Sequence, residues 1–217
     1  MEKPLLLLNL FTESVQKKDE KAAAQYRKEI LALDLDSEAA VIAKYRLGFF
    51  TLYQEKKADE AMAIFKEVAS CGIECDDYYQ CQITYAICLW STGKHELAIF
   101  ELRKTLSQTK PHTIHEVLAL DYLSIFLRDT KAPPEEIAEL NIRRISNLNV
   151  MLYAEKDIDI HASLTLELAA ALEERGLPAD LEEAHLILQK VVTLNNQINE
   201  TTVTAAKAAL KHLKKTA

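Results

Sequence analysis

Four cysteines are the residues of this sequence best suited to metal or redox chemistry, and all of them lie between positions 71 and 88. Their C-x3-C-x5-C-x6-C spacing differs from the paired C-x2-C spacing that holds zinc in a zinc ribbon. Cys81 and Cys88 are seven residues apart on a predicted helix, so they share one face and pack as small apolar side chains. Cys71 and Cys75 flank the turn at Gly72, where two thiols could approach, and a metal or redox role there is the less favoured alternative. We predict no metal site and no cofactor.

Histidines and acids give no better catalytic pattern. His115 opens a segment that begins like a zinc-protease helix, but Ala119 stands where the second histidine ligand is required. His112 and His115 could share a helix face, yet no third ligand follows nearby. The four glycines are too far apart for a phosphate-binding loop. We therefore predict no catalytic residues and no enzyme, although a triad assembled from distant positions would be invisible in sequence.

Composition limits the classes of fold and partner. The chain has 217 residues, 49% of them hydrophobic, with only 4 glycines and 5 prolines, which favours helices over a turn-rich β-protein. The net charge is −7, so a broad basic surface for nucleic acid phosphates is absent, and we predict no nucleic acid partner. The last 17 residues are the exception, because they carry four lysines and no acid: Lys207, Lys211, Lys214 and Lys215. We interpret them as a solvated terminal helix with cations at its negative dipole end.

No stretch of the sequence approaches the ~20 consecutive apolar residues that a transmembrane helix needs, so we predict no membrane span. The apolar residues that follow Pro4 are interrupted by Asn9, and no basic segment precedes them. This differs from a secretory signal peptide and is more typical of the buried face of a first helix. We expect a cytoplasmic protein.

Helix-breaking residues recur at nearly regular intervals, and between them apolar residues follow helical spacing. Thr113 and Asp180 are each followed three residues later by Glu, the pattern in which side chains satisfy free N–H groups at a helix start. Pro134 fits the first turn of another helix, where no N–H donor is needed. We predict an all-α fold with helices at about 3–17, 19–33, 37–54, 58–70, 76–92, 94–107, 113–129, 134–153, 158–175, 180–195 and 200–215.

The predicted helices come in pairs of similar sequence. Segments 57–65, 93–102 and 180–188 resemble one another. Taking Ala22, Ala61, Ala98, Ala138 and Ala184 as equivalent gives periods of 39, 37, 40 and 46 residues. Such periods are typical of a helical solenoid, in which each hairpin buries its apolar face against its neighbours.

The pairs resemble the tetratricopeptide repeat (TPR) family, in which small residues let the two helices of a repeat approach closely. In segment 77–106, Ala86 opposes Ala98 at the family's spacing of twelve, and in segment 43–70 Gly48 opposes Ala61 at thirteen. The resemblance implies a single right-handed TPR-like solenoid domain over residues 1–217. It would contain about five helical hairpins (approximately 3–33, 37–70, 76–107, 113–153 and 158–195) and a C-terminal capping helix at 200–215.

The resemblance also implies a binding face. In TPR arrays the first helix of each pair lines the concave side, where its outward side chains meet a partner. Carried over position by position, the partner-binding residues would be Arg46, Phe50, Tyr53, Gln54, Gln80, Ile83, Ile87 and Trp90. The apolar members would form an aromatic strip between polar edges. The alternative is that Trp90 and Phe50 belong to the core.

The side chains that hold two carboxylates in chaperone-binding TPR domains are absent, because Arg46, Phe50, Ile83 and Ile87 fill those positions. We expect instead a mainly apolar peptide or partner helix, steered by Arg46. The hypothesis is a non-catalytic scaffold or adaptor for protein–protein interaction. The alternatives are a secretion-type cargo chaperone, a regulator that binds a small peptide, and a self-assembling structural protein whose acidic body meets the basic 201–217 segment.

Overall fold

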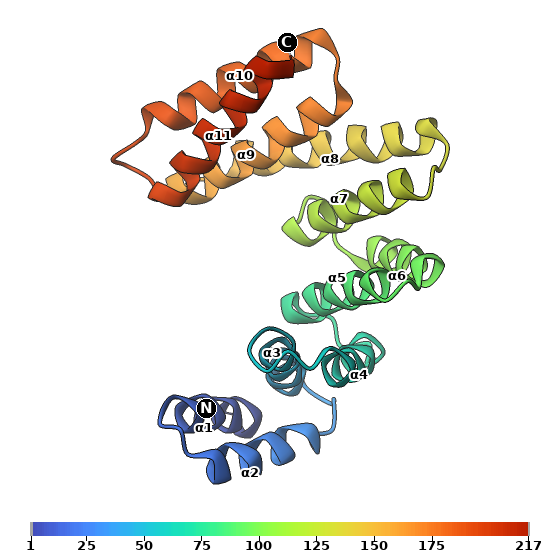
Figure 1. The fold of residues 1–217 in the computed structure, drawn as a ribbon, viewed down its shortest axis with the longest axis vertical. Helices are drawn as coiled ribbons and strands as arrows, with labels where there is room; N and C mark the ends of the chain where they lie inside the picture. Colours follow the sequence, from blue (N-terminus) through green and yellow to red (C-terminus); the bar gives the residue numbers. More distant parts are fainter. Residues whose placement is uncertain (1, 217) are drawn as a thin grey trace. The chain divides into compact units, whose positions relative to one another are not determined.

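The computed structural model describes the backbone of residues 2–216 and side chains as far as Leu213, so the side chains of Lys214 and Lys215 lie outside the described part. The described residues form eleven helices and no β-strand, which confirms the all-α prediction (Figure 1). The helices are α1 (Lys3–Gln16), α2 (Glu20–Leu31), α3 (Glu38–Tyr53), α4 (Ala58–Ala69), α5 (Asp76–Ser91), α6 (His95–Gln108), α7 (Ile114–Asp129), α8 (Pro134–Ala154), α9 (Ile158–Arg175), α10 (Pro178–Thr193) and α11 (Glu200–Thr216).

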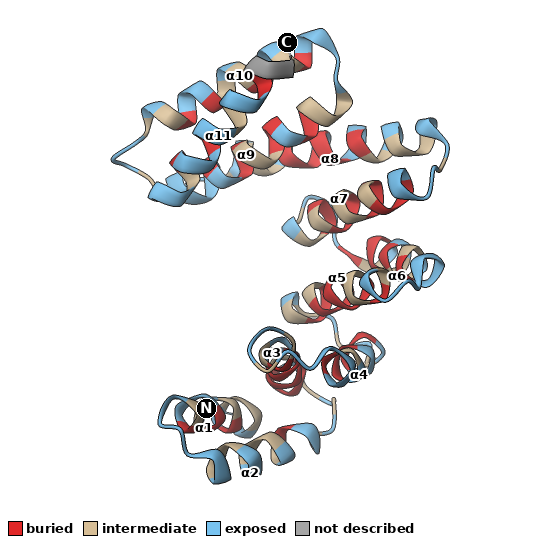
Figure 2. Ribbon diagram, viewed as in Figure 1, coloured by how far each residue is buried: buried red, intermediate tan, exposed pale blue. Residues whose placement is uncertain are grey.

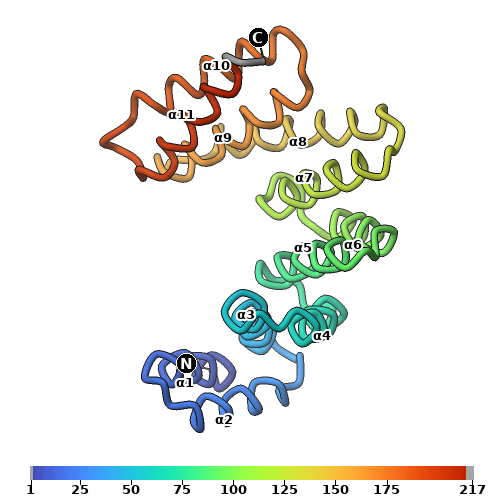
Figure 3. The backbone as a smooth tube through the Cα atoms, viewed as in Figure 1, coloured from blue at the N-terminus to red at the C-terminus, as the bar shows by residue number. Residues whose placement is uncertain are grey.

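The chain divides into two compact units, one ending at Gln108 and the other beginning at Thr109. In the first unit α1 packs against α2, α3 against α4 and α5 against α6, while α3 also contacts α1, α2 and α5. In the second unit α8 packs against α7 and α9, α10 against α9, and α11 against both α9 and α10. Short connections between consecutive helices are visible in the backbone trace (Figure 3). The prediction of a single domain over the whole chain stays a prediction.

Each unit has a buried cluster of its own, and buried residues form stripes along the helices (Figure 2). The cluster of the first unit joins the first two helix pairs through Leu7, Phe11, Ile30, Ala43, Leu47 and Ile64. The cluster of the second unit centres on α8, α9 and α10, with Leu148, Leu168, Leu172, Ala184 and Leu188 among its members. Fully burying one such leucine or phenylalanine contributes about 1.5–3 kcal/mol, so these stripes hold the helix pairs together.

One helix start follows the predicted cap and the other does not. The Thr113 side chain accepts a hydrogen bond from the Glu116 N–H at 3.3 Å, as expected. Asp180 is not an N-cap, because α10 begins two residues earlier, at Pro178, where the fixed φ of proline fits the first turn. The Asp180 carboxylate instead accepts two hydrogen bonds of 2.6 Å from the Arg175 guanidinium.

A glycine allows the close approach of α3 and α4. A Cβ placed on Gly48 would lie 2.6 Å from Cε1 of Phe65 and 3.2 Å from Cγ2 of Ile64. Both partners are buried side chains of α4. The small residue that the sequence places on α3 therefore permits the close approach of the two helices.

Candidate partner-binding surface

An aromatic ladder runs along α3 in steps of four residues. The ring centroids of Tyr45 and Phe49 lie 6.3 Å apart, and those of Phe49 and Tyr53 lie 4.3 Å apart. Tyr45 is buried, whereas Phe49 is 44% exposed and Tyr53 47% exposed. Residues four apart share a helix face, so the spacing of Tyr45, Phe49 and Tyr53 is a signal in the sequence for Phe49, which is not among the predicted partner-binding residues.

A hollow of about 300 Å³ lies between α1 and α3, next to the exposed part of this ladder. It is lined by Leu8, Asn9, Phe11, Thr12, Arg46, Phe49, Phe50 and Gln54. Three of these residues (Arg46, Phe50 and Gln54) were predicted as partner-binding from the sequence. We call this space the α1–α3 hollow.

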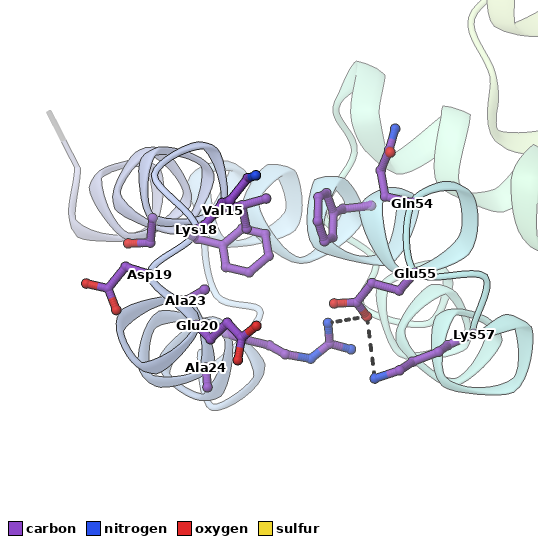
Figure 4. A pocket seen from close by; sticks show the side chains of 13 residues that line it. Val15, Lys18, Asp19, Glu20, Ala23, Ala24, Gln54, Glu55 and Lys57 are labelled. Carbon is purple, nitrogen blue, oxygen red and sulfur yellow. Dashed lines mark hydrogen bonds and ion pairs between the residues drawn. The ribbon is translucent and has the colours of Figure 1, made fainter.

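A second hollow of about 550 Å³ lies between the α1–α2 pair and the end of α3 (Figure 4). It shares Phe11, Phe50 and Gln54 with the α1–α3 hollow, and Val15 and Ala23 add further apolar surface. Figure 4 shows the Glu20 and Glu55 carboxylates turned toward the space between the two helix pairs. We call it the α2–α3 hollow.

Ion pairs link the two helix pairs beside the α2–α3 hollow. Arg27 of α2 contacts Glu55 at 2.8 Å and Glu60 of α4 at 3.0 Å. Lys57 contacts Glu55 at 3.7 Å and Glu60 at 3.6 Å. The positive and negative charges of this group therefore balance one another.

Phe50 forms the shared wall of the two hollows. Its ring meets the Phe11 ring edge-on, with centroids 5.1 Å apart and an interplanar angle of 87°. The side chain is half-buried against the core cluster of the first unit. Phe50 is thus both a packing residue and part of the accessible surface, since it also lines both hollows.

Arg46 points out from α3 with 58% of its side chain exposed. Its Nε lies 2.8 Å from Oδ1 of Asp77, on α5, and its guanidinium carbon lies 5.7 Å from the Tyr45 ring centroid. Tyr45 itself has a raised pKa, chiefly because burial disfavours the phenolate. Arg46 thus contacts α5 through its guanidinium and also lines the α1–α3 hollow.

The four residues predicted on α5 do not continue this surface. Ile83 is fully buried, so its placement on an exposed strip is wrong: α3, α4 and α6 all pack against α5 and leave little of it accessible. Gln80 and Ile87 are half-buried. Trp90 is also half-buried, and its ring stacks on His95 with centroids 4.2 Å apart. The accessible members of the predicted set are concentrated on α3.

All four cysteines belong to the first unit, and the surroundings of three of them are unfavourable for thiol chemistry. All four are free thiols. Burial raises the pKa of Cys75 and Cys88, and it raises the pKa of Cys81 strongly. Because the thiolate is the reactive form, these three thiols are less reactive than an exposed cysteine. In the described residues, no group of three or more possible metal-binding side chains comes together.

Comparison with known proteins rests on the fold. No family model matches the sequence, and no curated protein matches it. Two crystal structures of the nearly identical TPR-like repeats of a kinesin light chain assigned in Podosopora anserina, one of them a variant, have TM-scores of 0.57 and 0.54. They are 14% and 13% identical to this chain, and each match covers 91% of this chain and 98% of the other.

The fold is TPR-like. This confirms the fold expected from the paired small residues. A structure of PilW, a widely conserved type IV pilus biogenesis factor, matches with a TM-score of 0.48 and 18% identity, over 87% of this chain and 77% of PilW. Among the helices that the structure describes, none combines the length and the apolar content of a membrane span.

Proposed function

We propose that this TPR-like protein is a non-catalytic interaction scaffold that binds an apolar peptide segment or partner helix along α3. The observation that carries the proposal is the pair of hollows on either side of Phe50, next to the exposed Phe49 and Tyr53 rings. Aromatic side chains at the centre of a hollowed surface are the usual anchors of protein interfaces.

The exposed aromatic residues of α3 favour recognition of a partner through its side chains and not through its backbone. Phe49 and Tyr53 are each a little less than half exposed, and a partner that covered these residues would remove their apolar surface from water. The backbone N–H groups of α3 are engaged within the helix, so an extended strand cannot pair with them. Affinity must therefore come from apolar contacts in the hollows, with specificity from polar residues at their edges.

The proposal is tested by panning a random dodecapeptide phage library on the full chain and measuring the enriched peptides by fluorescence polarisation. We expect enrichment of peptides with two or more large apolar residues. The double variant Phe49→Ser/Tyr53→Ser should bind them at least about ten-fold more weakly, because it removes two exposed anchors. Its circular dichroism should match that of the unmodified chain, since both rings are about half exposed.

The matched control is Leu97→Ser on α6, a residue that is 41% exposed and lines neither hollow. It should leave binding unchanged. Equal affinity of the double variant and the unmodified chain would contradict the proposal, as would failure to enrich any peptide. Phe50→Ala is less suitable as the main variant, because it also removes the edge-on contact with Phe11.

A further inference from the structure

We propose that the segment bound along α3 carries an aspartate or glutamate side chain next to an apolar anchor, and that Arg46 binds this carboxylate at the edge of the α1–α3 hollow. This inference rests on the proposed function and adds the chemistry of the occupant. The anchor would lie against Phe11, Phe49 and Phe50.

The charge of the hollow is the first argument. Of the described residues that line it, only Arg46 carries a charge. The others are apolar or neutral polar side chains, and the ion pairs around Glu55 belong to the α2–α3 hollow. A ligand that fills the α1–α3 hollow with an apolar group therefore meets one positive charge at its edge.

The placement of the guanidinium is the second argument. The closest approach of Asp77 to Arg46 is between Oδ1 and Nε, at 2.8 Å, and 58% of the Arg46 side chain is exposed. Asp77 Oδ1 is buried and accepts no hydrogen bond among the described residues, so this contact is an ion pair without hydrogen-bond alignment. Because more than half of the Arg46 side chain is exposed, its guanidinium can donate to a second carboxylate beside that of Asp77.

A side-chain carboxylate fits better than the carboxylate at the end of a peptide. Terminal carboxylates are captured by groups of free backbone N–H donors. The residues that line this hollow lie inside α1 and α3, where those N–H groups are already bonded, and the Gln54 N–H bonds to the Phe50 carbonyl at 2.9 Å. Because the two hollows share Phe11, Phe50 and Gln54, a bound segment can also continue past Arg46 toward the α2–α3 hollow.

The net charge of the protein makes this preference specific. At −7, the chain as a whole attracts cationic peptides and repels acidic ones. A preference for an acidic residue beside the anchor would therefore have to come from a local cation. The experiment therefore compares the binding of peptides that carry aspartate, asparagine or lysine at this position.

The experiment uses an array of C-terminally amidated dodecapeptides with Leu and Phe four positions apart in an Ala/Ser background. One position beside an anchor is Asp, Asn or Lys, and a further set has Asn there and a free C-terminal carboxylate. Fluorescently labelled full-length chain is applied as the unmodified protein and as the variants Arg46→Gln, Arg46→Lys, Lys28→Gln and Phe49→Ser/Tyr53→Ser. Lys28 is an exposed cation of the same unit that lines neither hollow.

For the unmodified chain we expect aspartate peptides to bind about five-fold more tightly than asparagine peptides, as for a partly exposed ion pair. Arg46→Gln should abolish this ratio and turn the preference toward lysine, Arg46→Lys should keep part of it, and Lys28→Gln should leave it intact. Retention of the ratio in Arg46→Gln, or equal binding of aspartate and asparagine peptides, would overturn the inference. Preference for the free C-terminal carboxylate over aspartate would also overturn it.

The two proposals fail differently in this experiment. If peptides bind in a manner that depends on Phe49 and Tyr53 but without regard to aspartate, the scaffold proposal stands and the carboxylate inference is wrong. If no peptide in the array binds, both are contradicted.

Discussion

At the scale of single residues, the second unit contains buried charged side chains that form ion pairs between its helices. The sequence pattern did not predict that these charged residues would be buried. The Arg144 side chain is 2% exposed and contacts Asp121 at 2.5 Å, Glu174 at 3.2 Å and Glu167 at 3.3 Å. It joins α7, α8 and α9. Arg175 and Asp180 form a second pair, between α9 and α10, in which Asp180 is 4% exposed. Buried charges of this kind are costly unless paired, so both clusters depend on their partners.

The contributions of Asp180 and Asp121 to stability should change with pH in opposite directions. Hydrogen bonds from Arg175 lower the pKa of Asp180 below 3.8, so its stabilisation is present above that value and lost as pH falls through the folded-state pKa. Burial raises the pKa of Asp121 above 3.8, against the opposing effect of Arg144, so its contribution is greatest at low pH and is lost as pH rises through the folded-state pKa.

Urea unfolding between pH 7 and pH 3 therefore separates the two variants. Asp180→Asn should be less stable than the unmodified chain at pH 7, and the deficit should shrink as pH falls. Asp121→Asn should gain stability relative to the unmodified chain as pH rises to 7. Asp129→Asn, at the exposed end of α7, is the control variant. It shows how stability changes when one exposed carboxylate is removed. Parallel pH curves for Asp121→Asn and Asp180→Asn would contradict the assignment.

At the scale of helices, Gly48 sets how closely α3 and α4 pack. Gly→Ala inside an unconstrained helix stabilises by about 1 kcal/mol. Here the added methyl group would collide with Phe65, which is fully buried and cannot move aside freely. We therefore expect Gly48→Ala to lower the free energy of unfolding, by about 1–3 kcal/mol, as measured by urea titration followed by circular dichroism.

The exposed residue Ala63 of α4 provides the comparison for this variant. Ala63→Gly should cost about 1 kcal/mol from helix propensity alone. A Gly48→Ala chain that is more stable than the unmodified one would show that packing between α3 and α4 is looser than the structure indicates.

Helix positions were largely predictable because each helix carries its own signals. The N-cap Ser37 of α3 accepts a hydrogen bond from the Ala40 N–H, and Thr113 does the same for α7, as local sequence leads one to expect. The start of α10 was predicted at 180 instead of 178 because Asp180 looks like a cap. Its bond to Arg175 depends on the turn between α9 and α10, which a linear pattern does not show.

At the scale of the whole chain, the prediction of one continuous repeat domain remains to be measured. In helical repeats each hairpin is stabilised mainly by its neighbours, and this coupling spreads unfolding over adjacent hairpins. We expect calorimetry of the full chain to give one cooperative transition, with calorimetric and van't Hoff enthalpies in agreement. Two resolved transitions would mean that the units divided at Gln108 unfold separately.

The sequence by itself determined the all-α class, the pairing of helices and the TPR-like fold, because helix signals and small-residue spacing act over short distances along the chain. Only the tertiary structure decided which side chains of α3 and α5 a partner can reach. Ile83 and Phe49 are both large apolar residues on helices of similar length, yet one is fully buried and the other 44% exposed. The difference arises because α5 is covered by α3, α4 and α6, and no local pattern encodes which neighbours a helix face will meet.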